Sequence, residues 1–221
     1  MPGCVVEVFA TATATQQYAA LAGSAPSWTL VEDRALASLS DAFNPAGVVA
    51  VCRFVDRPLE HVLDPDGGAL LVAICADVRD PGNAGTVIRT ADAAGADAVI
   101  LAGSSVDLYN AKTLRASVGS AFHLPVAIEP DVQRAISAVH DAGLSVLAAD
   151  GAGEVDLHHA GDLLSGPTAW LFGNEAWGLQ PEIAALADHR VRIPIHGRAE
   201  SLNLATAAAL CLFESARGAG S

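Results

Sequence analysis

Lysine is almost absent from this chain of 221 residues, and basic residues of any kind are few. Lysine and arginine together number 12, with Lys112 the only lysine, against 25 acidic residues, so the formal net charge is −13 at pH 7. Such a charge keeps a protein soluble and argues against broad, non-specific adhesion to nucleic acid or to an anionic membrane. A local patch of arginines remains compatible with it, and arginine suits bidentate contacts with phosphate.

Cysteine is also sparse, and its spacing offers no framework for metal or disulfides. No Cys-x-x-Cys pair occurs, and the four cysteines stand far apart in mostly apolar surroundings, at Cys4, Cys52, Cys75 and Cys211. This pattern favours buried, reduced thiols in a cytosolic protein. His158-His159 has no partner at metal-ligand spacing. We therefore predict that the protein holds no metal.

Long apolar runs are lacking too. No stretch approaches the roughly 18 apolar residues of a membrane-spanning helix, and no basic segment precedes an apolar one at the start of the sequence. We expect a cytoplasmic protein that does not engage a membrane. Hydrophobic residues still make up 52% of the chain, which is enough for one large packed domain, or for one ordinary domain with a smaller partner.

Two common phosphate-binding signatures are missing. No Gly-x-x-x-x-Gly-Lys-[Ser/Thr] sequence occurs, which excludes a P-loop. The strand-to-helix turn at 80–89 does not supply Gly-x-Gly-x-x-Gly, and no helix-forming run follows Gly151-Ala152-Gly153. These absences argue against an oxidoreductase that binds a nicotinamide dinucleotide.

What the chain does contain is a regular alternation of apolar and helix-like segments. Apolar strands separated by helices predict a parallel sheet covered on both faces, which is an α/β fold. The strands expected in the larger, C-terminal part are 70–76, 98–101, 124–128, 145–149, 168–172 and 191–193. The helices expected there are 85–94, 110–118, 131–142, 181–187 and 201–217.

The first part of the chain alternates on a smaller scale. Strands are expected at 5–9, 28–31 and 47–54, and helices at 15–21 and 33–39. Turn-forming residues then interrupt the pattern, and Asp64-Pro65-Asp66-Gly67-Gly68 is the best linker. We predict one domain over residues 1–60 and a second over residues 68–221.

Polar side chains stand at the ends of several expected strands. Asn83 precedes an apolar helix face that carries Arg89, whose guanidinium can reach back over the strand ends; a surface arginine extending past apolar neighbours explains it equally well. After strand 168–172 comes Gly-Asn-Glu-Ala-Trp-Gly-Leu at 173–179, where the carboxylate of Glu175 does not suit a phosphate cradle. A third cluster, at 112–120, fits either a phosphate backbone or a solvated helix.

The C-terminal segment combines polar residues with an unusually apolar helix. Ile193-Pro194 is followed by Ser201, a good N-cap for the last helix, and by Asn203 in its first turn. The run 205–214 is apolar on nearly all sides, so we expect it to be buried by the sheet and by a second subunit.

Three of these segments together resemble the signature of the SpoU/TrmH branch of the SPOUT methyltransferases. They are Asn83-x-Gly85-x-x-x-Arg89, the loop 173–179, and Ile193-Pro194 followed by Ser201-Leu202-Asn203. Members of this branch methylate ribose 2′-hydroxyls of RNA with S-adenosylmethionine. The resemblance implies a parallel α/β sheet whose C-terminal segment threads a deep trefoil knot, an exception to the usual topology rules, and it implies a homodimer.

The resemblance also assigns residues. Contacts with S-adenosylmethionine are expected at Gly173, Asn174, Gly178, Ile193, Ile195, Leu202 and Leu204. The expected catalytic set is Asn83, Arg89, Glu175, Ser201 and Asn203. Contacts with RNA are expected at Lys112, Arg115 and Ser117.

Arg89 is the residue that the family offers for activating the ribose hydroxyl. A free arginine, with a pKa above about 12, is a poor base. We therefore expect Arg89 to grip the adjacent phosphate and to stabilise the developing alkoxide. Asn83, Glu175, Ser201 and Asn203 would orient the substrate, Arg89 and each other, and the proton acceptor stays open.

The first 60 residues resemble the second half of an L30e-like RNA-binding module, which in this family precedes the knot. They begin abruptly, as though the first half were missing or the start misassigned. Because minimal tRNA-modifying members lack this module, the resemblance favours ribosomal RNA, 23S in particular, over tRNA. The rival hypothesis is a non-catalytic RNA-binding homologue, which the partial domain and the acidity motivate and the intact catalytic residues oppose.

Overall fold

The computed structural model describes residues 3–39, 46–63 and 71–219. The chain divides into two compact units, Met1–Val55 and Asp56–Ser221, and each is described by itself. The linker expected at Asp64–Gly68 lies outside the described residues, as does the first residue of the strand expected at 70–76.

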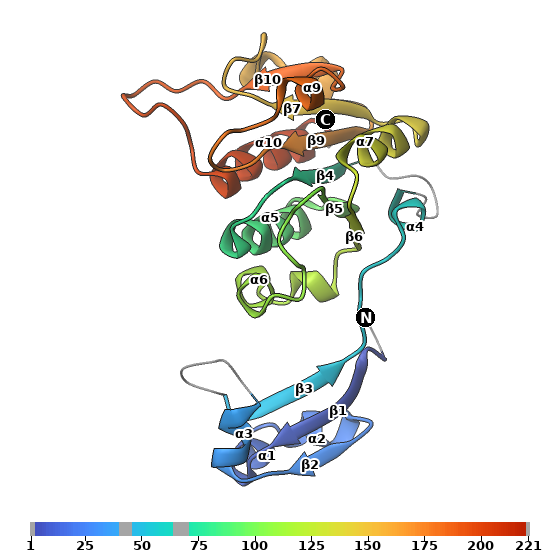
Figure 1. The fold of residues 1–221 in the computed structure, drawn as a ribbon, viewed down its shortest axis with the longest axis vertical. Coiled ribbons are helices and arrows are strands. Elements are labelled where there is room, and N and C mark those ends of the chain that lie inside the picture. Colours follow the sequence, from blue (N-terminus) through green and yellow to red (C-terminus); the bar gives the residue numbers. More distant parts are fainter. Residues whose placement is uncertain (1–2, 40–45, 64–70, 220–221) are drawn as a thin grey trace. The chain divides into compact units, whose positions relative to one another are not determined.

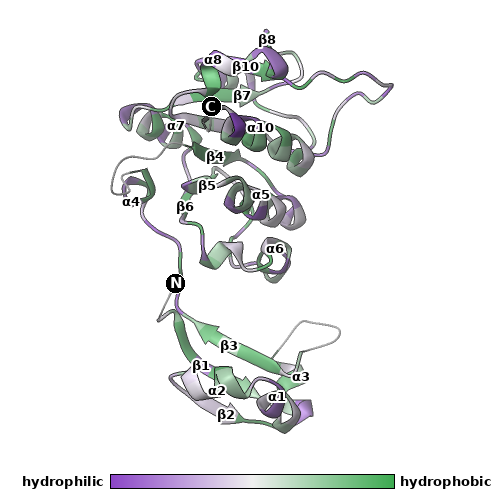
Figure 2. Cartoon of the chain, turned by 180° about the vertical axis from the view of Figure 1, so that it is seen from behind, coloured by the Kyte–Doolittle hydropathy of each residue, from purple (hydrophilic) through white to green (hydrophobic). Residues whose placement is uncertain are grey.

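The smaller unit is built on a three-stranded sheet in the order β2-β1-β3 (Figure 1). Strand β1 runs parallel to β2 and antiparallel to β3. The strands are β1 (Val5–Ala10), β2 (Trp28–Leu30) and β3 (Val48–Cys52), and the helices are α1 (Ala12–Gln17), α2 (Ala19–Ser24) and α3 (Asp33–Ser38). Strands β1 and β3 are coloured largely as apolar in Figure 2.

The helix expected at 15–21 is in fact two short helices. The chain leaves the helical conformation at Tyr18, where φ is −110° and ψ is 36°. Helix α1 starts earlier than expected because the Thr11 side chain accepts a hydrogen bond from the amide of Ala14 and caps it. The assignment of this unit as a partial L30e-like domain stays a prediction.

The larger unit is a seven-stranded sheet in the order β6-β5-β4-β9-β7-β10-β8, and every pairing in it is parallel. Its strands are β4 (Leu71–Ala76), β5 (Ala98–Ala102), β6 (Val126–Glu129), β7 (Ser145–Ala149), β8 (Val155–Asp156), β9 (Thr168–Phe172) and β10 (His189–Arg192). The prediction of a parallel α/β sheet is confirmed. The two-residue strand β8 was not expected, because its apolar content is too small to stand out in the sequence.

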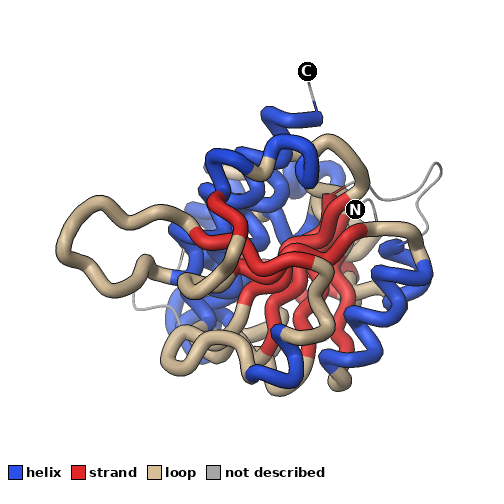
Figure 3. Tube along the Cα trace, turned by 90° about the horizontal axis from the view of Figure 1, so that it is seen from above, coloured by secondary structure: helices blue, strands red, loops and turns tan. Residues whose placement is uncertain are grey.

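Helices cover both faces of this sheet, as Figure 3 shows with the strands in red between helices in blue. They are α4 (Leu59–Leu63), α5 (Pro81–Ala94), α6 (Ala111–Ser117), α7 (Val132–Asp141), α8 (Gly161–Leu164), α9 (Pro181–Ala184) and α10 (Leu204–Ala219). Because side chains alternate along a strand, β4 feeds two cores. Ala73 and Cys75 join the core beneath α5 and α10, whereas Val72 and Ile74 join the core beneath α4 and α7.

Helix α5 begins at Pro81, not at Gly85 as expected. Asp80 is its N-cap, with Oδ1 accepting a hydrogen bond from the Asn83 amide at 2.8 Å, and Pro81 occupies the first helical position, where its missing N–H costs nothing. Asn83 therefore lies in the first turn of the helix, and Arg89 lies in the third turn instead of one turn in.

Helix α10 begins at Leu204, so the expectation that Ser201 caps it is wrong. The cap is Asn203, whose Oδ1 accepts hydrogen bonds from the amides of Ala205 at 2.9 Å and Thr206 at 3.3 Å. Residues 193–203 form a long loop that extends from the sheet before returning to α10 (Figure 1). In the described part of the chain, no helix is both long enough and apolar enough to cross a membrane.

Candidate functional site

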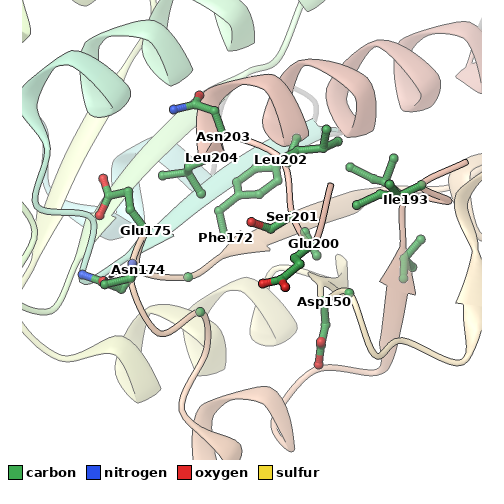
Figure 4. Close-up of a pocket in the computed structure, with 18 residues that line it drawn as sticks. Asp150, Phe172, Asn174, Glu175, Ile193, Glu200, Ser201, Leu202, Asn203 and Leu204 are labelled. Atoms are coloured by element: carbon green, nitrogen blue, oxygen red, sulfur yellow. Dashed lines mark hydrogen bonds between the residues drawn. The ribbon is translucent and has the colours of Figure 1, made fainter. Parts of the chain in front are cut away.

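A cavity of about 510 Å³ opens where β7, β9 and β10 end (Figure 4). The carboxyl ends of parallel strands are where α/β sheets usually bind ligands, and the volume lies in the range of small-molecule sites. All seven predicted cofactor residues line it: Gly173, Asn174, Gly178, Ile193, Ile195, Leu202 and Leu204. Glu175, Ser201 and Asn203 of the predicted catalytic set line it as well.

The loop that follows β9 is closed by its own backbone. Asn174 and Gly178 exchange two hydrogen bonds, from the Asn174 amide to the Gly178 carbonyl at 3.0 Å and back at 2.9 Å. Gly178 has a φ of +70°, which favours glycine. At Gly173 a Cβ would lie 2.4 Å from the carbonyl carbon of Gly178. Gly173 is therefore required for the loop to close on itself.

Asn174 ties this loop to the end of β4. Its Nδ2 donates to the carbonyl oxygen of Asp77 at 2.7 Å, and its Oδ1 accepts from the amide of Ala176 at 2.8 Å. The side chain is 6% exposed, so both bonds are largely shielded from water. Asn174 fixes the position of the loop as well as lining the cavity.

Glu175 binds the start of α5. Its Oε2 accepts from the Arg79 amide at 3.3 Å, and its Oε1 accepts from the Asp80 amide at 3.1 Å and from Asn83 Nδ2 at 3.2 Å. A carboxylate is stabilised at a helix N-terminus, where backbone amides are left without partners. The acidic residue of this loop therefore organises the turn between β4 and α5.

Asn83 connects Glu175 to Asn203. While its Nδ2 donates to Glu175, its Oδ1 accepts from Asn203 Nδ2 at 3.0 Å. The chain Glu175–Asn83–Asn203 thus joins three separate sequence segments, and each member belongs to the predicted catalytic set. The expectation that these residues orient each other agrees with these bonds.

Arg89 and Ser201 stand apart from this chain. Ser201 is exposed in the loop before α10 and lines the cavity. Arg89 is exposed on α5 and makes no hydrogen bond or ion pair with any other described residue. The structure therefore leaves its guanidinium open to a ligand and does not bring it into contact with Glu175.

The three predicted RNA residues all lie on α6 but differ in accessibility. Lys112 Nζ lies 3.3 Å from Asp80 Oδ2, with both side chains exposed, and Arg115 is exposed on the same helix. Ser117 is fully buried, and its Oγ donates to the carbonyl oxygen of Leu114 at 2.9 Å. Ser117 is thus not accessible to RNA, because this side of α6 packs against α5.

The packing of α6 on α5 explains the glycine of the first motif. A Cβ at Gly85 would lie 2.3 Å from the carbonyl oxygen of Thr113, 2.7 Å from Ala116 Cβ and 3.0 Å from the amide of Ser117. Only glycine allows the two helices to approach this closely. Gly85 acts in packing and does not line the cavity.

The cavity is acidic and apolar. Asp150, Glu175 and Glu200 contribute carboxylates, and in the described part of the chain no lysine, arginine or histidine lines it. Asp150 Oδ2 also lies 3.8 Å from Arg190 Nη1 on the neighbouring strand. Such a lining suits a ligand that carries positive charge and an apolar portion, and it opposes a phosphate.

Sequence reasoning missed several lining residues. Asp150 and Gly151 follow β7, Phe172 ends β9, and Glu200 lies in the loop before α10. The signal for Asp150 was present, because it stands at the carboxyl end of an expected parallel strand. Glu200 gave no signal, since its place depends on the path of a long loop.

The charge on Asp80 is stabilised from two sides. The amide of Asn83 is the largest cause that holds the pKa of the Asp80 carboxyl below its ordinary value, and Lys112 acts in the same direction.

In the core beside Glu175, burial raises the pKa of the Cys75 thiol to about 12. Cys75 is therefore a neutral, inert thiol near neutral pH.

Arginines of the larger unit fall into two groups. Those that contact a carboxylate are Arg134, Arg190, Arg192 and Arg217. Among the described residues no carboxylate contacts the guanidinium of Arg57, Arg79, Arg89, Arg115 or Arg198. Three of this second group, Arg79, Arg89 and Arg115, belong to the β4–α5 turn, α5 and α6, so these elements carry positive charge despite the acidic composition.

No group of three or more histidine, cysteine, aspartate or glutamate side chains in the described part of the chain is arranged to hold a metal ion. The carboxylate of Glu175 is already bound by backbone amides and by the side-chain amide of Asn83. The expectation that the protein holds no metal stays a prediction.

Comparisons with known proteins all point to one family. The model of the SpoU rRNA Methylase family matches residues 70–213. The 23S rRNA (guanosine(2553)-2′-O)-methyltransferase RlmP of Bacillus subtilis is 32% identical over 187 residues, covering 83% of this chain and 70% of the relative. The 23S rRNA (uridine(2479)-2′-O)-methyltransferase of Streptomyces viridochromogenes is 39% identical over 178 residues, covering 78% of this chain and 61% of that relative.

A solved structure extends the match to most of the chain. The AdoMet-bound rRNA methyltransferase from Sinorhizobium meliloti superposes with a TM-score of 0.83 at 36% identity, covering 96% of this chain and 80% of that one. The similarity therefore includes both the parallel sheet and the smaller N-terminal unit.

Proposed function

This chain belongs to the SpoU rRNA methylase family, and we propose that it is a cytoplasmic enzyme that transfers a methyl group from S-adenosylmethionine to the 2′-hydroxyl of a ribose in ribosomal RNA. The observation that carries the proposal is the position of an acidic, apolar cavity lined by Glu175 and Asn203, which Asn83 joins to each other by hydrogen bonds. As a member of this family, the chain is expected to form a trefoil knot within its parallel α/β sheet domain.

The lining of the cavity fits S-adenosylmethionine. When bound, this cofactor supplies a methyl group on a positively charged sulfonium. Phe172, Ile193, Leu202 and Leu204 offer apolar surface for the adenine ring, while Asp150 and Glu200 offer carboxylates to its positive groups. The absence of basic side chains from the described lining agrees with a ligand that has no phosphate. Relatives of this chain are named for the same chemistry, and one was solved with AdoMet bound.

The acceptor side of the reaction depends on positioning. Methyl transfer is an in-line displacement, so holding the ribose oxygen in line with the methyl group supplies much of the acceleration. Asn83 is the residue best placed to hold it, because Glu175 and Asn203 fix both ends of its amide. Ser201 lines the cavity from the opposite segment and completes the set of polar groups around the acceptor.

Arg89 supplies positive charge to the substrate. Its guanidinium is exposed and without a carboxylate partner among the described residues, on the same helix as Asn83. In this role it binds the phosphate next to the target ribose and stabilises the alkoxide that forms as the hydroxyl loses its proton. Lys112 and Arg115 on α6 extend the same charged surface along the RNA backbone.

Ribosomal RNA is the substrate class that we favour, and 23S rRNA within it. The support is the naming of the curated relatives and the match of the smaller unit to a ribosomal RNA methyltransferase. A tRNA substrate is the second candidate, since a neighbour that covers 68% of this chain concerns methylation of tRNA. A non-catalytic RNA-binding role is opposed by the intact Glu175–Asn83–Asn203 chain.

The site is proposed to work in a homodimer. Helix α10 buries Ala208, Cys211 and Leu212 against the sheet, yet Leu210 and Phe213 on its other side are 44% and 51% exposed. Two large apolar side chains on adjacent turns of an exposed stripe are typical of a contact surface. A second copy covering this stripe would bring its own basic residues to the RNA.

The proposal is tested by methyl transfer from radiolabelled S-adenosylmethionine to 23S rRNA, 16S rRNA and tRNA, each as a separate substrate. The expected result is label in a single 2′-O-methylated nucleotide of 23S rRNA. Label in tRNA alone would favour the second candidate. Cofactor binding with no transfer to any RNA would support the non-catalytic role.

A further inference from the structure

Trp177 is an exposed aromatic side chain in a rigid loop. It is 49% exposed, whereas Trp170 of the adjacent strand β9 is fully buried. The loop around it is held by the paired backbone of Asn174 and Gly178, and Glu175 anchors it to the β4–α5 turn. A fixed backbone that presents a large aromatic ring to solvent is not explained by packing.

The Trp177 side chain is not part of the cavity wall. Every residue from Phe172 to Ala176 lines the cavity, as does Gly178, but Trp177 does not. Figure 4 shows the cavity side of this loop, where the carboxylate of Glu175 lies. The indole is therefore directed elsewhere, and it does not serve as a lid over the cofactor.

Arg79 covers part of the indole. The guanidinium carbon of Arg79 lies 5.3 Å from the ring centroid, a cation–π contact. No carboxylate contacts the Arg79 guanidinium within the ranges 3–39, 46–63 and 71–219. The backbone amide of Arg79 donates to Glu175 Oε2 at 3.3 Å. Arg79 and Trp177 are therefore held together by the carboxylate of Glu175, which also belongs to the Glu175–Asn83–Asn203 chain.

We propose that Trp177 and Arg79 form a stacking platform for a base of the RNA substrate, next to the nucleotide whose ribose is methylated. Unpaired bases stack on aromatic rings and on guanidinium planes, and this is a common way for proteins to hold splayed-out RNA. Trp177 stands two residues from Glu175, within about 8 Å along the backbone. A base on the platform therefore lies next to the acceptor ribose. The Arg79 guanidinium then contacts the phosphate of the stacked nucleotide.

The platform rests on the proposed function, because that function makes RNA the substrate. The chemistry of stacking adds a prediction about which bases the platform accepts. Stacking tolerates every base because each has a π-face. Trp177 therefore strengthens RNA binding and holds the strand in register, while the choice of target nucleotide depends on other contacts.

The kinetic test compares Trp177→Ala, Trp177→Phe and Arg79→Gln with Leu186→Ala, which removes an exposed apolar side chain that does not line the cavity. We expect Trp177→Ala to lower kcat/KM for 23S rRNA by roughly 10- to 100-fold, mainly through KM, as for loss of one stacked base. Trp177→Phe should lose clearly less, and Leu186→Ala should match the parent. The Kd for S-adenosylmethionine, measured by calorimetry, should stay unchanged in all four.

A binding test gives a readout that needs no turnover. Tryptophan fluorescence of the parent should be quenched by a single-stranded oligoadenosine and much less by an abasic ribose-phosphate oligomer of equal length. The quenching should vanish in Trp177→Phe, because only Trp28 and Trp170 remain. Equal quenching by the abasic oligomer would mean phosphate binding without stacking, and would overturn the platform.

The two proposals fail in different ways. If the parent methylates rRNA and Trp177→Ala does so equally well, the platform is wrong and the proposed function stands. If oligoadenosine quenches Trp177 but no RNA is methylated, Trp177 does stack on RNA bases, whereas the proposed function is wrong and with it the place of the stacked base beside a methylated ribose. If Trp177→Ala loses affinity for S-adenosylmethionine instead of RNA, Trp177 belongs to the cofactor site and the platform is wrong.

Discussion

The side-chain oxygen of Asn83 accepts a hydrogen bond from Nδ2 of Asn203 across 3.0 Å, which joins helix α5 to the start of helix α10, 120 residues later in the chain. The amide of Asn83 is held at its other end by Glu175. A side-chain amide fixed at both ends has one orientation, and the polar groups beside the cavity are therefore set before any substrate binds.

Replacing Asn83 by aspartate should impair catalysis while sparing the cofactor site. The new carboxylate would face Glu175 Oε1, now 3.2 Å from Asn83 Nδ2, and like charges at this distance repel. Because Asn83 does not line the cavity, the Kd for S-adenosylmethionine should change little, whereas kcat should fall by about 100-fold, as for loss of one preorganised donor. A variant with full kcat would show that the amide orientation is not needed.

Gly85→Ala should destabilise the protein without touching the cavity. The added methyl would lie 2.3 Å from the carbonyl oxygen of Thr113 and force α5 and α6 apart, at a cost of roughly 1–3 kcal/mol in the free energy of unfolding. Gly166→Ala is the matched control, since nothing lies within 4 Å of its Cβ. Urea unfolding of both variants measures the difference, and equal midpoints would contradict the packing role of Gly85.

Asp80 should stabilise α5 in a pH-dependent way. Its pKa is lowered in the folded protein, first by the Asn83 amide and also by Lys112, so its contribution is complete above the ordinary value of 3.8 and is lost as pH falls through the lowered pKa. Asp80→Ala should lose about 1 kcal/mol at neutral pH, as for removal of an N-cap. The difference from the parent in the urea midpoint should shrink below pH 3.8.

Lys112→Gln is the control for that experiment. The Lys112–Asp80 pair is exposed on both sides, and such pairs contribute between about 0 and 1 kcal/mol. Its loss should therefore change the unfolding free energy less than the loss of the cap does. If Lys112→Gln proved the more damaging change, the cap would not be the main role of Asp80.

Leu210→Glu should abolish the proposed dimer. Leu210 is 44% exposed on α10, beside Phe213, on the side opposite the residues that face the sheet. A buried, unpaired carboxylate opposes association strongly, so sedimentation velocity should show a dimer for the parent and a monomer for the variant. Leu186→Glu, placed on another exposed apolar residue, should leave the dimer intact. A parent protein that sediments as a monomer would contradict the proposed homodimer.

Sequence patterning predicted the elements of the fold better than their ends. The apolar run at 168–172 became β9 with the expected bounds, because a strand buried on both faces must be apolar throughout. Helix starts were less secure, since the segment before α10 offers two capping residues, Ser201 and Asn203. Only the hydrogen bonds from Ala205 and Thr206 decide between them.

The candidate site was predicted where local sequence carries it. Glycines, amides and the carboxylate of the loop 173–179 are a specific pattern, and all of the predicted cofactor residues line one cavity. Contacts between distant segments left no trace in the sequence, among them the Arg79–Trp177 pair and the place of Glu200. Ser117 was misjudged because the burial of one face of α6 depends on how closely α5 approaches at Gly85.

The central claim is tested most directly by mapping the methyl group that the parent, Arg89→Ala and Arg89→Lys transfer to 23S rRNA. The parent should place label on the 2′-oxygen of one nucleotide. Arg89→Ala should lose roughly 100-fold or more in kcat with an unchanged Kd for S-adenosylmethionine. Arg89→Lys should lose less kcat than Arg89→Ala, because lysine keeps the positive charge but lacks the planar, bidentate donors of the guanidinium. Label on a base, or full activity of Arg89→Ala, would contradict the account.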